Sequence, residues 1–292
     1  MFSQASTGIL DLQRELATLQ KQTSSGNKFD NFVDMGTDIS RIQDMQASIA
    51  ATSRFSNNND IALSRLHLMD SAVSQIQDVA SQLSSSLVTE NSASGSVFDL
   101  AGFARNALQQ VEGALNTSQA GRSLFAGSKT DQGAVGNLTI STNVFNDIST
   151  PSYYNGDSFI ASVQASDTLS LDYGVTAGDK AFQDIIGALH KAIDLDASNT
   201  SADRQLASDL LQSAITRLTS VRSGINNSIV TLTSVNDQHS QVKVQLTDAL
   251  SKLTGTDVVQ ASISASQIEA TLTATMQMFA RITSLRLVDF LK

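Results

Sequence analysis

The sequence predicts a mainly α-helical protein: long antiparallel helical rods, coiled-coil-like N- and C-terminal helices, and a small β-rich insertion in the middle. Three observations lead to this prediction. Apolar residues recur at gaps of three and four at both ends of the chain. Only 1 Pro occurs among 292 residues, so helices can run long. Aromatic residues make up 5% of the chain, which favours narrow contacts between helices over one thick core.

The N-terminal segment, residues 1–30, is expected to be an assembly helix. Its apolar residues have the a/d spacing of a coiled-coil seam, which places them in one stripe along a helix. The stripe lies so close to the chain end that little protein surrounds it. It must therefore meet the other end, another subunit, or both. The residues that we expect to bind a partner here are Phe2, Ile9, Leu12, Leu16 and Leu19.

The C-terminal segment, residues 255–292, repeats this alternation and is the second predicted assembly helix. Gly255 suits the end of the preceding helix, and Thr256 or Asp257 suits the N-cap of the last one. Near the C-terminus the apolar residues face several directions, which is typical of a binding surface. The predicted partner-binding residues are Ile268, Leu272, Met276, Phe279, Ile282, Leu285, Leu287 and Phe290.

Between these ends we expect two halves of one helical rod domain, residues 31–130 and residues 179–254. The first half has helical periodicity from about Asp38 to Thr89 and again from Val97 to Thr117. The second half is helical from Asp179, pauses, and continues from about Ala202 to Lys252. Helices from the two halves of the chain therefore bracket its middle, which brings the two terminal stripes side by side.

Residues 131–178 form the predicted β-rich insertion. Short alternating runs occur at Leu138 and Ile140, at Ala161–Ala165 and at Leu169–Tyr173, and Asn155-Gly156 is a hairpin signal. We expect an outward-facing surface module on which few core contacts depend, so that its deletion would leave the helices intact.

The composition and the motifs of the chain disfavour catalysis, metal binding and nucleic-acid binding as its function. A net charge of −9 and a pI of about 4.7 disfavour nucleic-acid binding. The absence of Cys excludes disulfides and thiolate metal sites, and no apolar run approaches the ~20 residues of a membrane span. The first residues lack the basic and apolar regions of a cleavable signal peptide, so export would need another route.

Three segments imitate ligand sites without completing them. Gly121–Thr130 (GRSLFAGSKT) departs from the spacing of a phosphate loop, so we expect a turn there. Asp194–Ser198 begins like a calcium loop, but the chain lacks that loop's later Gly and Glu. The three His have no ligand partners at short spacing, and His239 is expected to be packed or half-exposed. We therefore predict no enzyme, no cofactor and no metal.

Several short motifs occur in an order typical of one family. They are Ala114–Thr117 followed by Gly121–Thr130, the turn Tyr154–Asp157, Asp172–Val175 followed by Ala181–Phe182, and the ending Ser284–Leu291 (SLRLVDFL). Together with the helical plan, they resemble the flagellin superfamily, and within it the hook–filament junction family, hook-associated protein 3. The resemblance in architecture covers essentially the whole chain.

Two stretches depart from the family. Asn27–Gly36 lacks the double Asp and the Pro that are usual in this loop. Val79–Val88 lacks the Leu-Gln-Arg stretch that is common in filament flagellins, which, with the short insertion, favours the junction family.

The resemblance implies a structural subunit of the bacterial flagellum that is secreted unfolded through the flagellar export channel. It implies a ring or helical layer of copies of this chain outside the cell, between hook-associated protein 1 and flagellin. It also implies a cytoplasmic flagellar export chaperone that holds the C-terminal apolar residues before secretion. Two alternatives stay open: a filament flagellin subunit, and a non-flagellar secreted coiled-coil translocator or adhesin.

Overall fold

The computed structural model describes the backbone of residues 2–29, 38–92, 99–139, 152–195 and 201–290. Side chains are described for residues 6–29, 38–87, 99–139, 152–195 and 202–281.

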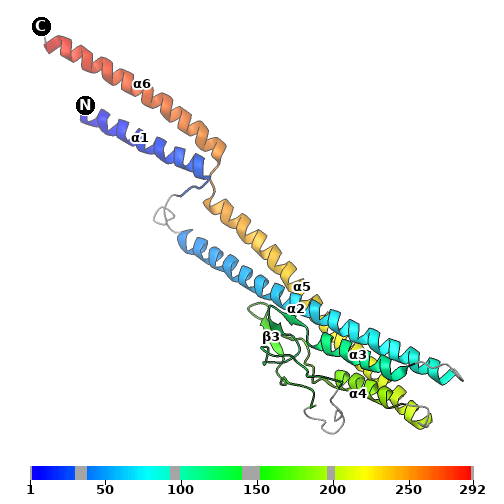
Figure 1. Ribbon diagram of the computed structural model, residues 1–292. Coiled ribbons are helices and arrows are strands. Elements are labelled where there is room, and N and C mark those ends of the chain that lie inside the picture. Colours follow the sequence, from blue (N-terminus) through cyan, green and yellow to red (C-terminus); the bar gives the residue numbers. More distant parts are fainter. Residues whose placement is uncertain (1, 30–37, 93–98, 140–151, 196–200, 291–292) are drawn as a thin grey trace. The chain divides into compact units, whose positions relative to one another are not determined.

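Long helices dominate the described part of the chain, and two short strand pairs accompany them (Figure 1). The helices are α1 (Phe2–Ser25), α2 (Ile39–Ser92), α3 (Leu100–Leu115), α4 (Lys180–Asp194), α5 (Ser201–Thr254) and α6 (Val258–Phe290). The strands are β1 (Ser118–Gln119), β2 (Arg122–Ser123), β3 (Ala161–Gln164) and β4 (Ser170–Tyr173). The prediction of a mainly α fold with a small β insertion is confirmed.

The chain forms two compact units. Unit 1 combines residues 1–51 with residues 241–292, and unit 2 comprises residues 52–240. The long helices α2 and α5 each contribute to both units. In unit 1, α1 and α6 lie side by side, as Figure 1 shows. The two ends of the chain therefore meet, as the matching stripes predict.

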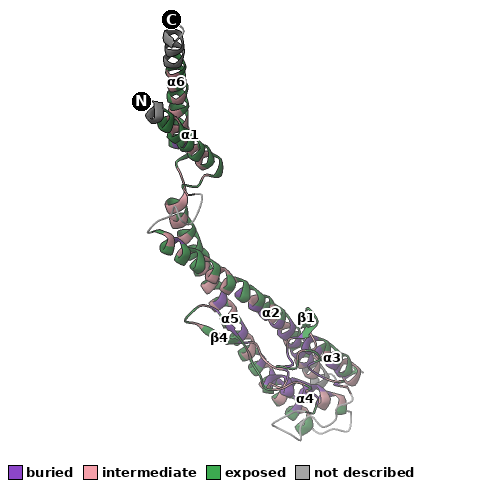
Figure 2. Cartoon of the chain, turned by 90° about the vertical axis from the view of Figure 1, so that its left-hand side faces the viewer, coloured by how far each residue is buried: buried purple, intermediate pink, exposed green. Residues whose placement is uncertain are grey.

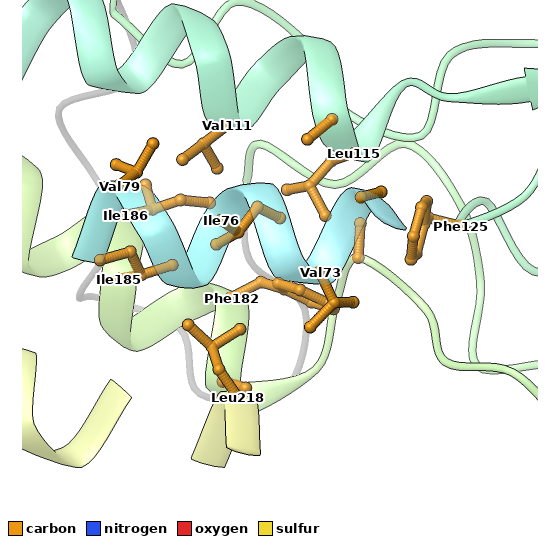
Figure 3. Packing of buried hydrophobic residues seen from close by; sticks show 14 of the residues in the cluster. Val73, Ile76, Val79, Val111, Leu115, Phe125, Phe182, Ile185, Ile186 and Leu218 are labelled. Carbon is orange, nitrogen blue, oxygen red and sulfur yellow. The ribbon is translucent and has the colours of Figure 1, made fainter. Parts of the chain in front are cut away.

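Unit 2 contains a core shared by α2, α3, α4 and α5. Buried residues gather where these helices lie together, in purple in Figure 2. In the close-up of Figure 3, Ile76 of α2, Val111 of α3 and Ile186 of α4 lie close together, and Leu218 of α5 lies beside Phe182. The rings of Phe125 and Phe182 meet edge to face, with centroids 6.0 Å apart. Apolar burial of this extent is what holds the four helices together.

The two long helices run antiparallel within unit 2. Asn59 of α2 bonds to Asn236 of α5, while Gln77, five turns further along α2, bonds to Thr219, which lies earlier in α5. Their shared face is partly polar, because Arg222 reaches Asp70 at 2.8 Å across it. These contacts fix which residues of the two helices lie opposite each other.

The short helices begin at aspartate caps. Asp99 Oδ1 accepts a hydrogen bond from Gly102 N at 2.7 Å, and Asp179 Oδ1 accepts one from Ala181 N at 2.8 Å. Each cap satisfies a backbone N–H that has no partner within the first helical turn. These caps start α3 and α4 at the positions that let their apolar faces reach the core of unit 2.

The insertion is part of the core of unit 2, so the expectation that few core contacts depend on it is wrong. Leu138 and Ala165 are fully buried in the same cluster as the helices. Tyr153 is 2% exposed and donates its hydroxyl hydrogen to the carbonyl of Ala177 at 3.0 Å. Sequence periodicity missed this role, because these residues lie in turns and short strands with no long repeat.

The hairpin of the insertion also differs from the expected one. It is formed by β3 and β4, which pair antiparallel with Val163 opposite Leu171. The Asn155-Gly156 pair lies outside any strand, and only the single bridge of Tyr154 to Val135 is adjacent. Leu138 lies in a turn, and Ile140 falls outside the described residues. Asn155 instead bonds to a neighbouring loop, because its N–H donates to the carbonyl of Ala134 at 2.9 Å.

Candidate assembly interface

The N-terminal half of the candidate interface is the seam of α1. Ile9, Leu12, Leu16 and Leu19 are half-buried, whereas the residues between them are exposed. Leu10, on another face of the helix, is 50% exposed. The stripe therefore faces α6, its neighbour in unit 1. A 24-residue helix gains most of its stability from such an apolar contact.

The matching seam of α6 is formed by the predicted a/d residues. Ala261 is buried, and Ile268, Leu272 and Phe279 are half-buried. The angle between successive residues of a helix is about 100°, which puts these residues on one side. The two seams thus cover each other within one chain.

Backbone hydrogen bonds between the residues after α1 and the residues before α6 hold the two seams in register. Gly26 ends α1 at φ +72, a conformation that a residue with a side chain rarely adopts. The N–H of Lys28 donates to the carbonyl of Thr254 at 2.6 Å, and the N–H of Thr256 donates to the carbonyl of Gly26 at 3.0 Å. The end of α1 is therefore tied to the start of α6, and the helices run antiparallel.

The predicted cap of the last helix is present. The carboxylate oxygen Oδ1 of Asp257 accepts hydrogen bonds from the N–H groups of Val259 and Gln260, each at 3.0 Å. The break before it needs a residue without a side chain, because a Cβ at Gly255 would lie 2.5 Å from the carbonyl oxygen of Ser251. These two residues set the point at which α6 begins.

A second apolar row lies on the side of α6 opposite the seam. Val259 is 70% exposed and Ile263 is 48% exposed, and the exposed Ala270 and Ala274 continue the row at gaps of seven and four. Helical geometry turns these positions away from Ile268 and Leu272. The a/d spacing does not include this row, although the four-residue gap between Val259 and Ile263 is visible in the sequence.

The predicted partner-binding residues thus fall into three groups. Ile9, Leu12, Leu16, Leu19, Ile268, Leu272 and Phe279 are half-buried along the α1–α6 pair. Met276 is 42% exposed at the flank of the seam. Phe2, Ile282, Leu285, Leu287 and Phe290 lie outside the residues whose side chains are described. Binding of a partner by these residues stays a prediction.

The surface of this interface carries little charge. Between Ser262 and Phe279, Glu269 is the one charged residue in the sequence. Arg14 of α1 pairs with Asp11 at 3.1 Å on the exposed side of the same helix. A weakly charged apolar face is suited to burial between subunits, because few ions would have to be desolvated.

The phosphate-loop imitation and His239 have structural roles, whereas Asp196–Ser198 of the calcium-loop imitation lies outside the described residues. Gly121 lies in the tight turn of the β1–β2 hairpin with φ +76, next to Ala120 with φ 51. His239 is half-buried, and its Nε2 lies 2.7 Å from the carbonyl oxygen of Ala165. Within the described residues, no three His, Cys, Asp or Glu side chains are grouped as a metal site would require. Nor is any described helix both long and apolar enough to span a membrane.

The N-terminal part of the chain is similar to a known protein family. Residues 1–130 match the family model of the bacterial flagellin N-terminal helical region. This segment contains α1, α2 and α3, and therefore half of the α1–α6 pair. No curated protein matches the sequence.

Three solved structures are similar to this chain at low sequence identity, and the one with a TM-score above 0.5 shares its fold. A Vibrio parahaemolyticus structure, assigned provisionally as a flagellar hook-associated protein, has a TM-score of 0.62 at 14% identity, over 76% of this chain and 100% of that one. FlgL from Bacillus cereus matches at 14% identity over 76% of this chain and 97% of its own, with a TM-score of 0.38. FlgL from Xanthomonas campestris matches at 15% identity over 70% and 99%, with a TM-score of 0.43.

The family match and the shared fold agree with the sequence resemblance. The family match covers residues 1–130, which include α1 of the candidate interface. Residues 1–130 of this chain match the family model of the bacterial flagellin N-terminal helical region, and the chain shares its fold with the Vibrio parahaemolyticus structure.

Proposed function

We propose that the protein is a structural subunit of the bacterial flagellum and forms the junction layer between hook-associated protein 1 and the flagellin filament. One observation carries the proposal: α6 has two apolar faces, and the described part of the chain covers only one of them. Ile268 and Leu272 lie on the covered face, while Val259 and Ile263 lie exposed on the opposite face. The flagellin match of residues 1–130 supports the flagellar context.

The mechanism is packing between copies. The α1–α6 seam makes each terminal pair a stable unit, and the exposed row of α6 then contacts a neighbouring copy. A row that meets a different surface on the next copy forms a heterologous contact, which continues as a ring or helical layer. The low charge of residues 262–279 favours burial in such a layer.

The resemblance to flagellar proteins extends the proposal to export and location. The subunit is secreted through the flagellar export channel and lies outside the cell, at the hook–filament junction. Before secretion a cytoplasmic export chaperone holds the apolar residues near the C-terminus, including Leu285, Leu287 and Phe290. A chaperone would receive them as an apolar helix face in a groove.

A charge on the exposed row tests the assembly mechanism. Ile263→Asp places a carboxylate on the proposed contact, whereas Ser158→Asp adds the same charge at an exposed polar position of unit 2. We expect Ile263→Asp to prevent incorporation into hook–filament structures while the monomer keeps its helical content. Normal incorporation of Ile263→Asp would contradict the use of this row.

The position in the flagellum requires a separate measurement. The chain has no Cys, so a single Cys at the exposed Ser158 can be labelled specifically. We expect label at one band where hook and filament meet. Label along the whole filament would favour the filament flagellin alternative, and its absence from flagella would favour a non-flagellar translocator or adhesin.

A further inference from the structure

The apolar core of unit 2 stops before the long helices reach the edge of this unit. Ala62 of α2 and Leu232 of α5 are buried. Beyond them, α2 has one buried side chain between residues 52 and 61, and α5 has none between residues 233 and 240. The buried side chain in α2 is Asn59, which is 0% exposed. Apolar burial alone therefore does not explain why the helices stay together here.

A polar layer takes the place of the core at this point. Asn59 Nδ2 donates to the carbonyl oxygen of Ala165 and to Asn236 Oδ1, each at 3.1 Å. Asn236 Nδ2 in turn donates to Asp60 Oδ1 at 2.6 Å. Ala165 is fully buried and follows β3 directly. The β3–β4 hairpin thus supplies a buried acceptor to a side chain of α2.

The same carbonyl group also contacts α5. His239 Nε2 lies 2.7 Å from the carbonyl oxygen of Ala165, and a carbonyl oxygen can only accept, so Nε2 carries the hydrogen. The His239 ring is stacked on Phe55 of α2, with centroids 5.9 Å apart and planes at 16°. One hairpin carbonyl therefore accepts from both long helices.

Two further hydrogen bonds hold the Ala165 carbonyl in place. The N–H of Ala165 donates to the carbonyl of Leu169 at 2.8 Å, which closes the turn. At the other end of β4, Arg65 of α2 donates from Nη1 to the hydroxyl of Tyr173 at 3.1 Å. The hairpin is thus fixed to α2 at two points, and its turn reaches α5 as well.

We propose that the β3–β4 hairpin is a strap, which holds α2 and α5 together through the Ala165 carbonyl where the apolar core of unit 2 ends. The strap couples residues 52–61 of α2 and residues 233–240 of α5 to the hairpin. Without it, the buried amide of Asn59 and the buried carbonyl of Ala165 would lose partners that water cannot replace in a closed site. The helices would then separate locally up to the first apolar layer, at Ala62 and Leu232.

Two substitutions remove the donors and preserve shape. His239→Phe keeps a ring that can stack on Phe55 but has no N–H group. Asn59→Leu replaces the amide with an apolar side chain of similar size. The matched control is His67→Phe, because His67 is exposed on α2. Amide hydrogen exchange of the full chain, read by peptide or by residue, reports local opening.

We expect His239→Phe to speed exchange about tenfold at Ala165–Leu169 and in residues 52–61 and 233–240, the change that loss of one buried hydrogen bond produces. Exchange in α3 and α4 should stay unchanged, as it should throughout in His67→Phe. Asn59→Leu should show the same local pattern.

Three results would overturn the strap. Unchanged exchange in both variants would show that the carbonyl is not needed. Faster exchange of the hairpin alone would show that residues 52–61 and 233–240 hold together without it. A uniform rise throughout unit 2 would show general loss of stability instead of local release.

Discussion

Arg222 of α5 and Asp70 of α2 form a two-pronged ion pair across the long helices of unit 2. Nε donates to Oδ1 at 2.8 Å, and Nη2 donates to Oδ2 at 3.4 Å. Nη1 of the same guanidinium donates to Gln77 Oε1 at 3.2 Å. A planar guanidinium held at three points fixes the register of the two helices more precisely than an apolar contact could.

Replacing this arginine should lower stability modestly. We expect Arg222→Ala to reduce the free energy of unfolding by about 1 kcal/mol, because the pair is partly exposed and screened by water. Urea unfolding followed by circular dichroism measures the change. Lys252→Ala breaks the more exposed pair with Asp248 and should have a smaller effect. Equal effects of the two substitutions would contradict a special role for Arg222.

Removing an aromatic ring from the core should cost far more. Phe182 is fully buried and meets Phe125 edge to face. We expect Phe182→Ala to lower the free energy of unfolding by about 3–5 kcal/mol, since the cavity cannot close fully. Phe159 is 55% exposed, so Phe159→Ala should change it by less than about 1 kcal/mol. The same urea titration checks both, and a small effect of Phe182→Ala would mean that the core is packed differently.

Truncating a buried side chain of the insertion should destabilise the protein as much as truncating one in the helical core. Leu138 is fully buried in the helical cluster, and we expect Leu138→Ala to lower the free energy of unfolding by about 2–5 kcal/mol. Ile160, in the same insertion, is 40% exposed and serves as the control. Thermal unfolding of Leu138→Ala and of the control Ile160→Ala shows whether the insertion belongs to the core. If Leu138→Ala unfolds at the temperature of the unmodified protein, the insertion is a detachable surface module after all.

His190 should make unit 2 sensitive to acid. Burial lowers the pKa of this side chain, although the hydrogen bond with the backbone of Leu138 and the charge of Asp194 oppose the shift. Its Nε2 is buried and has no partner in the described part of the chain. The folded state therefore favours neutral His190, while the unfolded state takes up a proton near the ordinary value of about 6.5.

Acid should destabilise the folded protein, because His190 has a lower pKa in the folded state than in the unfolded state. The contribution of His190 to stability is fully present above about pH 6.5 and falls as the pH is lowered toward the depressed pKa of the folded state. We expect His190→Gln to show a weaker loss of stability between about pH 7 and about pH 5 than the unmodified protein. His67→Gln, at an exposed position, should show the unmodified loss. Identical pH profiles for all three proteins would exclude this role of His190.

Local signals predicted the helices closely. A helix expected from about Asp38 to Thr89 is α2, Ile39–Ser92, and one expected from about Ala202 to Lys252 is α5, Ser201–Thr254. Periodicity, caps and breaks act over a few residues, so they can be read without knowing the fold. The a/d spacing also predicted that the terminal helices meet.

Contacts between distant segments could not be read in this way. Asn59 and Ala165 are 106 positions apart, and no pattern within either segment indicates that they bond. Leu138 and Tyr153 looked like parts of a surface module, yet they are buried among helices.

The sequence by itself determined the mainly α fold, the approximate limits of the long helices and the antiparallel seam of the terminal pair. Each of these depends on repeats and turn residues that act locally. Only the tertiary structure decided which apolar row of α6 stays exposed, that the insertion belongs to the core, and that one hairpin carbonyl joins α2 and α5. These features depend on which surfaces meet once the chain has folded, because burial is a property of the packed arrangement and not of a residue type.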